Sequence, residues 1–188
     1  MPSLHVQTVQ LTLLCHARTD AQRTGHFSHD DDAILDGVQR PPRTCQAVLC
    51  APERRARQTA AWVTDAFEID PLLRDVNLGR WQGLSLKQVQ RDEPQALAQW
   101  MSDPDSVVHG GESIAHLCQR VACWLQACSV VPGDRLAVTH PFVIRAALMQ
   151  VLGSTPASLQ CMDVLPCASV HLAYTGRWRL RLLQNASL

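Results

Sequence analysis

Apolar and polar side chains alternate near the start of the chain. The alternation covers residues 8–14, TVQLTLL, and its period of two predicts a β-strand. The strand is expected to lead through Cys15 into His16. Three further short apolar stretches predict strands, at 46–50, 69–73 and 135–139, and the last of these ends next to His140.

Between these strands the apolar residues recur at helical spacing. Pro52 is expected to open a helix, because proline is favoured at the first helical position. The buried stripe of that helix would be Ala56, Ala60, Val63 and Phe67. Further helices are predicted within 85–103, with a break near Pro94, from Gly110-Gly111 onward, and over 142–152.

Two segments complete the pattern. Residues 20–43 are polar and are interpreted as a long surface loop, and ASVHLAY with WRLRLLQ predicts a closing hairpin around Thr175-Gly176. Alternating strands and helices are typical of an α/β fold, here a three-layer sandwich with a mostly parallel central sheet. We expect one domain over 1–188, with 84–109 as a small cap over the site and with Trp81 and Trp100 as packing residues.

Composition narrows the class of protein. Lys+Arg and Asp+Glu are both 17, and this balance argues against nucleic-acid binding, which needs a basic excess. No apolar run is long enough to span a membrane, and the first residues lack the pattern of a signal peptide. We therefore expect a cytoplasmic protein without nucleic-acid or membrane partners, and a homodimer is compatible with the sequence.

The eight cysteines are interpreted as small, reduced, apolar residues. The chain is long enough to build a core without disulfides. It has no Cys-x-x-Cys pair of the kind that zinc sites usually show. No metal site is predicted.

Polar side chains gather where the predicted strands end. These are His16 after the first strand, Arg54, Arg55 and Arg57 after the second, Asp75 after the third and His140 after the fourth. The carboxyl ends of parallel strands share one edge of a sheet, which is where ligands bind in such folds. Two histidines, arginine and a helix N-terminus suit an oxyanion such as phosphate.

Five blocks in order resemble the histidine phosphatase superfamily, which has the phosphoglycerate mutase-like fold. The family opens with Arg-His-Gly-x-Thr, matched by LLCHART, so His16 and Thr19 take the places of the catalytic histidine and the hydroxyl residue. The block Ser-Pro-Leu-x-Arg-Ala-x-x-Thr-Ala is matched by APERRARQTA, with Arg55 at the phosphate-binding arginine. The remaining matches are LRDVNLGRWQG with Asp75 at the acid, the Gly-Gly-Glu-Ser of 110–113, and VTHPFVIRAAL around His140.

The resemblance implies phosphoryl transfer to a histidine without a metal or organic cofactor. His16 would attack phosphorus while its other ring nitrogen donates to a backbone carbonyl. Arg55 and His140 would hold the equatorial oxygens, and Thr19 would donate a further hydrogen bond. Asp75 would protonate the leaving oxygen, for which a raised pKa is expected.

Three positions depart from the family. Cys15 replaces its first arginine, Ala17 replaces its glycine, and Asp75 is shorter than the usual glutamate. Arg23, or else Arg18, is predicted to supply the missing cation. A cysteine phosphatase is rejected, because an arginine should stand six positions after the nucleophile, and those positions are alanines.

The sequence therefore predicts a phosphomonoesterase acting on a small phosphorylated metabolite that the sequence does not identify. Two alternatives stay open. One is a degenerate family member that binds phosphorylated ligands with little or no turnover. The other is a metal-dependent hydrolase that uses His16, His140 and Asp75. A mutase is less favoured, because a short chain has little material with which to exclude water.

Overall fold

The computed structural model describes residues 8–35 and 45–182. Its strands are β1 (Val9–Cys15), β2 (Ala47–Cys50), β3 (Glu68–Ile69), β4 (Gly133–Thr139), β5 (Ser169–Tyr174) and β6 (Trp178–Arg181). Within the described ranges these strands form one sheet in the order β3-β2-β4-β1-β5-β6. The first four are parallel, β5 pairs antiparallel with β1, and β6 pairs antiparallel with β5. The expected α/β class with a mostly parallel sheet is confirmed.

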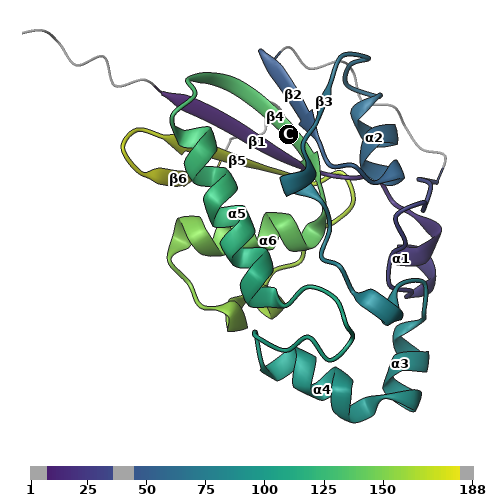
Figure 1. The fold of residues 1–188 in the computed structure, drawn as a ribbon. Helices are drawn as coiled ribbons and strands as arrows, with labels where there is room; N and C mark the ends of the chain where they lie inside the picture. The colour runs from purple at the N-terminus through teal and green to yellow at the C-terminus, as the bar shows by residue number, and fades with distance from the viewer. Residues whose placement is uncertain (1–7, 36–44, 183–188) are drawn as a thin grey trace, which may run out of the picture.

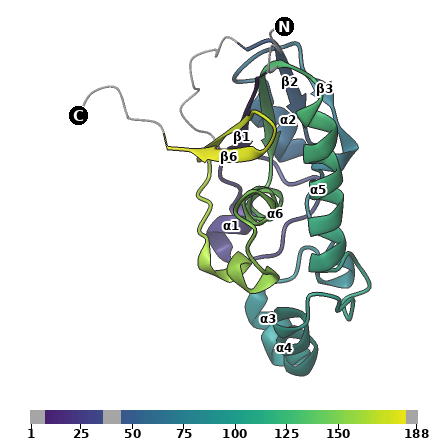
Figure 2. The same cartoon turned by 90° about the vertical axis from the view of Figure 1, so that its left-hand side faces the viewer.

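Helices cover both faces of this sheet (Figures 1 and 2). The main ones are α2 (Arg54–Ala60), α5 (Ile114–Ser129) and α6 (Pro141–Leu152). The chain moves outward along the sheet from β2 to β3 and returns to β4, so right-handed crossovers place α2 and α5 on opposite faces. Accordingly α5 packs on α6, while α2 packs on β2 and β4. Central strand β1 is covered on both sides, and five consecutive residues at its end are buried.

Three local expectations are corrected by the structure. The third strand is only two residues long, because Pro71 follows it and starts a 3₁₀ turn over Pro71–Leu73. Helix α2 starts at Arg54 with Glu53 as its N-cap, so Pro52 lies before the helix and not at its first position as expected. The polar segment 20–43 contains a short helix, α1 (Asp20–Thr24), and its residues 36–43 lie outside the described ranges.

The segment 84–109 forms two short helices, α3 (Leu86–Asp92) and α4 (Pro94–Ser102). They lie together at one end of the molecule, away from β2 and β3 (Figure 1). Trp81 is fully buried between this segment and the body, where it stacks on Phe27 and meets Trp100 edge-on, with ring centroids 6.0 Å apart in both pairs. None of the described helices is both long and apolar enough to cross a membrane.

Candidate active site

The two histidines meet because their strands are neighbours. Cys15 at the end of β1 is in register with Thr139 at the end of β4, so the residues that follow these strands leave the sheet side by side. The ring centroids of His16 and His140 are 5.2 Å apart. Both side chains are almost fully buried. The sheet edge predicted to hold the site therefore brings these two residues together.

His16 is held in one tautomer. Its Nδ1 lies 2.7 Å from the carbonyl oxygen of Ala17, and a carbonyl only accepts, so Nδ1 carries the proton. The expected donation to a backbone carbonyl is confirmed, and Nε2 keeps a free lone pair. Burial lowers the pKa of His16 to about 3, and the charges of His140 and Arg55 act in the same direction. The imidazole is therefore neutral near pH 7.

Thr59 connects this loop to helix α2. Its hydroxyl accepts a hydrogen bond from the Ala17 N–H at 2.9 Å and donates to the Arg55 carbonyl at 2.7 Å. The side chain is 1% exposed. One buried hydroxyl thus fixes the peptide beside His16 relative to the helix that carries Arg55.

Arg55 is buried and points into the site. One guanidinium nitrogen donates to the carbonyl of His29 at 2.8 Å, and another pairs with Asp75 Oδ2 at 2.7 Å. Its Nε is buried without a hydrogen-bond partner. A guanidinium placed in this way can offer N–H groups to phosphate oxygens.

Asp75 lies between Arg55 and His140. Its Oδ2 contacts Arg55 and is 3.5 Å from His140 Nδ1, while its Oδ1 accepts the Val76 N–H. Burial alone would raise the pKa of Asp75, but His140, Arg55 and His16 outweigh burial and hold the pKa below its ordinary value. The expectation of a raised pKa is therefore wrong for the site as it stands.

Glu53 is a site residue that sequence reasoning missed. Its Oε2 accepts a hydrogen bond from His140 Nε2 at 2.7 Å, and its Oε1 accepts the Asp75 N–H at 2.9 Å. Burial would raise the pKa of Glu53, but the hydrogen bond from His140 holds it below its usual value. The ionised carboxylate only accepts, so Nε2 of His140 carries a proton, and Nδ1 is buried without a hydrogen-bond partner, 3.5 Å from Asp75 Oδ2. A signal was available, because Glu53 occupies the leucine place of the family's second block.

Three predicted phosphate-binding residues do not line the pocket. Thr19 is buried, but its hydroxyl caps α1 in a capping box with Gln22. Arg23 is exposed and pairs with Asp20 of the same helix, and Arg18 is exposed. The structure therefore does not bring Arg23 or Arg18 to the place of the missing arginine.

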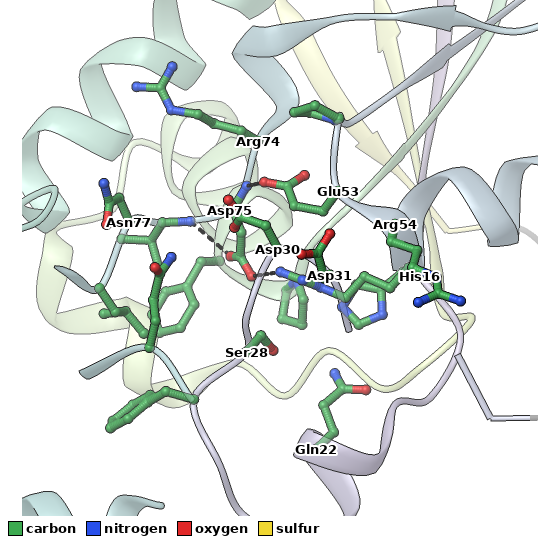
Figure 3. Close-up of a pocket in the computed structure, with 18 of the residues that line it drawn as sticks. His16, Gln22, Ser28, Asp30, Asp31, Glu53, Arg54, Arg74, Asp75 and Asn77 are labelled. Atoms are coloured by element: carbon green, nitrogen blue, oxygen red, sulfur yellow. Dashed lines mark hydrogen bonds and ion pairs between the residues drawn. The ribbon is translucent and has the colours of Figure 1, made fainter. Parts of the chain in front are cut away.

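The pocket around these groups has a volume of about 430 Å³. Its cations are Arg54, Arg55, Arg57 and Arg74, and its acids include Asp30, Asp31, Glu53 and Asp75. Figure 3 shows Arg54 and His16 on one side of the pocket, with Arg74 and Asn77 on the other. No residue of the segment 84–109 lines it, so the expected cap does not form a wall of this cavity.

Two rival chemistries can be compared with the geometry. Burial raises the pKa of Cys15 to about 12, so its thiol stays protonated and is a poor nucleophile. Within residues 8–35 and 45–182 no three His, Cys, Asp or Glu side chains are grouped so that they could hold a metal ion.

Comparison with known proteins bears on the family and the fold. The family pattern of the histidine phosphatase superfamily (branch 1) matches residues 11–186. The chain is 28% identical over 125 residues to glucosyl-3-phosphoglycerate phosphatase of Mycobacterium tuberculosis, which covers 59% of this chain and 56% of that protein. The chain therefore spans a little over half the length of this relative. Phosphoserine phosphatase 1 of Hydrogenobacter thermophilus is 24% identical over 162 residues and 77% of each chain.

Solved structures share the fold. The mycobacterial glucosyl-3-phosphoglycerate phosphatase in complex with VO3 superposes with a TM-score of 0.76 at 24% identity, over 95% of this chain and all of the other. The alpha-ribazole phosphatase of Shigella flexneri gives a TM-score of 0.78 at 21% identity, over 93% and 96% of the two chains. From the match over 11–186, the chain belongs to the histidine phosphatase superfamily, branch 1.

Proposed function

We propose that the protein is a phosphomonoesterase that hydrolyses a small phosphorylated metabolite through a phosphohistidine on His16. The observation that carries the proposal is the tautomer of His16. Its Nδ1–H is bound to the Ala17 carbonyl, so Nε2 is left as an unprotonated nucleophile beside Arg55 and His140. The phosphatases among the relatives support the reaction class, and the activity of this chain is inferred from its own site.

The first step forms one bond and breaks one. Nε2 of His16 attacks phosphorus in line, the P–O bond to the alcohol breaks, and the leaving oxygen takes a proton from Asp75. Arg55 and Nδ1 of His140 face the equatorial oxygens. In the second step Asp75 removes a proton from water, the water oxygen attacks phosphorus, and the P–N bond breaks to release phosphate and free His16.

Asp75 must gain a proton before it can act as an acid. In the site as it stands, His140 and Arg55 keep it ionised. A phosphate ester brings negative charge next to Asp75. Its phosphate oxygens also draw the Arg55 guanidinium into hydrogen bonds and away from Asp75. Both changes disfavour the carboxylate. The substrate thus prepares its own general acid, and this accounts for a pKa that is low without ligand.

Glu53 would act as a positioning residue for His140. The hydrogen bond at 2.7 Å fixes the ring, as a buried carboxylate does for histidine in other enzymes, and leaves Nδ1 on the side of Asp75, 3.5 Å from its Oδ2. This support matters more here than in relatives with the first arginine, because Cys15 offers no positive charge. Arg54, which lines the pocket, is our candidate for the third cation in place of Arg23.

The covalent intermediate provides the test. With labelled p-nitrophenyl phosphate and rapid quenching, acid-labile and base-stable label is expected on His16, and His16→Ala should abolish both label and turnover. Label on a cysteine, or full activity of the variant, would contradict the mechanism. The alternative of a degenerate binder rests on the neutral Cys15, and it predicts calorimetric binding of orthovanadate without hydrolysis of any ester.

A further inference from the structure

A second cavity lies beside the phosphate pocket. It has a volume of about 720 Å³ and is enclosed by α4, the first residues of α5 and α6, and the 3₁₀ turn at Pro156–Cys161. Its walls are mainly apolar, and its lining includes Phe27, Leu97, Trp100, Met101, Phe142 and Leu159. The segment 84–109 therefore builds this cavity rather than the polar one.

The two cavities are neighbours. Phe27 and Phe142 line both of them, and Phe142 stands two residues after His140 in the first turn of α6. The two cavities therefore adjoin at these two aromatic rings. The alcohol part of a phosphate ester that extended across these rings would enter the second cavity.

The rim of the second cavity exposes large apolar side chains. Leu86 is 47% exposed and Met101 is 53% exposed, and both belong to the lining. Removing such surface from water is favourable. The cavity is thus suited to a ligand with an apolar body rather than to a sugar or an amino acid alone.

Arg145 brings a positive charge to the lining of this cavity. Its guanidinium lies 5.4 Å from the centroid of the Phe142 ring, and no carboxylate pairs with it in the described parts of the chain. Arg145 Nε and Trp100 Nε1 are buried without hydrogen-bond partners. A half-buried cation with apolar neighbours and no counter-charge is costly, and a ligand acceptor would relieve that cost.

From these observations we infer that the substrate is a phosphomonoester whose alcohol carries a ring-sized apolar group in the second cavity and an acceptor, such as a carboxylate, against Arg145. The inference rests on the proposed function, because it treats the polar pocket as the phosphate site. It makes Met101 and Arg145 specificity-determining residues. Trp100 packs against Trp81, His109 and Phe142, as expected, and would also form part of the substrate-binding wall.

The test compares phenyl, 2-naphthyl and 6-carboxy-2-naphthyl phosphate, whose leaving groups have similar acidity. We expect kcat/KM to rise about tenfold from phenyl to 2-naphthyl, and again on adding the carboxylate. Met101→Glu should remove most of the first increase and Arg145→Met most of the second. Leu152→Glu, at a position that is 58% exposed and lines neither cavity, is the control and should leave both increases intact.

A binding measurement separates this inference from the proposed function. Naphthalene-2-carboxylate, which has no phosphate, should bind to the wild-type protein in calorimetry and bind at least fivefold more weakly to Met101→Glu. If no ester is hydrolysed but this result holds, the proposed function fails and the subsite stands. If all three esters react alike and neither variant changes their ratios, the subsite is wrong. A wild-type dimer that Met101→Glu dissociates would also overturn it, because a second chain would then cover the cavity.

Discussion

At the scale of single residues, Asp75 has two tasks that require opposite protonation states. It must give a proton to the leaving oxygen and later take one from water. Asp75→Asn keeps the shape but cannot do either. We expect kcat/KM for alkyl phosphates, whose leaving groups need a proton, to fall at least 100-fold, and for p-nitrophenyl phosphate to fall much less. An equal loss on both classes in steady-state assays would show that Asp75 acts only through its charge.

Glu53 can be separated from a merely structural residue by two substitutions. Glu53→Leu introduces the residue of the family block and removes the acceptor for His140 Nε2, so we expect kcat to fall about 100-fold as the ring loses its fixed position. Glu53→Gln keeps an acceptor oxygen and should recover at least tenfold of that loss. Equal kcat in the wild-type protein and Glu53→Leu, both folded by thermal melting, would disprove the positioning role.

The missing arginine leads to a third prediction. Arg54 lines the pocket, whereas Arg23 is 61% exposed and paired with Asp20. Arg54→Ala should lower kcat/KM for p-nitrophenyl phosphate at least tenfold, because a positive charge near the equatorial oxygens is lost. Arg23→Ala is the matched control and should stay within about twofold. If Arg23→Ala lowers kcat/KM at least tenfold and Arg54→Ala does not, then Arg23 supplies the missing positive charge, as the sequence predicted.

At the scale of elements, the loop that carries Asp75 is held from α5 and β4. Arg120 donates to the carbonyls of Leu72 and Arg74 and forms a two-pronged pair with Glu112. The Thr139 hydroxyl donates to the Leu73 carbonyl at 2.7 Å. The Gly-Gly-Glu-Ser block thus has a structural role. A Cβ on Gly111 would stand 2.0 Å from the Asn77 carbonyl oxygen, so this position needs glycine.

Arg120→Met tests that connection. The side chains of Arg120 and Glu112 are 8% and 9% exposed, and removing Arg120 leaves the buried Glu112 carboxylate with only Arg74, 3.8 Å away, as an ion-pair partner. We expect the free energy of unfolding to fall by about 3 kcal/mol in urea titrations. Arg120→Met with Glu112→Leu should lose less than the single variant, because no unpaired charge remains. A double variant that is less stable than Arg120→Met would contradict this account.

The elements also show what the sequence could predict. Apolar patterning located β1, β2 and β4, and the parallel pairing of β1, β4, β2 and β3 brings His16, His140, Arg55 and Asp75 to one sheet edge. It did not indicate which way exposed arginines point, because that depends on local pairs such as Arg23 with Asp20. The role of Thr19 as a helix N-cap could have been predicted, since Thr19 and Gln22 have the spacing of a capping box. The second cavity could not be predicted from the sequence, because its lining comes from segments that are far apart in the chain.

At the scale of the whole molecule, the buried groups of the site couple folding to pH. The pKa of His16 in the folded protein is about 3, against 6.5 ordinarily, so the unfolded chain binds a proton more readily. The neutral form therefore contributes stability that is complete above about pH 6.5 and is lost as the pH falls toward 3. The pKa values of Glu53 and Asp75 are also lowered. Their contributions are present above their ordinary pKa values and disappear only at more acidic pH.

The histidine window begins at a higher pH than the carboxylate windows, and this makes the histidine effect measurable. Between pH 6.5 and 5 the carboxylates stay ionised in both states, whereas unfolded His16 takes up a proton. One such proton corresponds to a slope of up to about 1.4 kcal/mol per pH unit, so the free energy of unfolding should fall by about 1–2 kcal/mol over this interval. Burial also lowers the pKa of His109, which adds a change of the same sign.

His16→Asn isolates the contribution of the active-site histidine. Asparagine is similar in size and does not titrate, and His109 is left untouched, so the variant should lose only the part of the slope that belongs to His16. Urea titrations at pH 7.5, 6.5, 5.5 and 5.0 should therefore give a stability difference between the wild-type protein and the variant that narrows steadily as the pH falls. Parallel curves would mean that His16 titrates alike in the folded and unfolded states. Its imidazole would then not be held neutral by burial, and the nucleophile would need another source of activation.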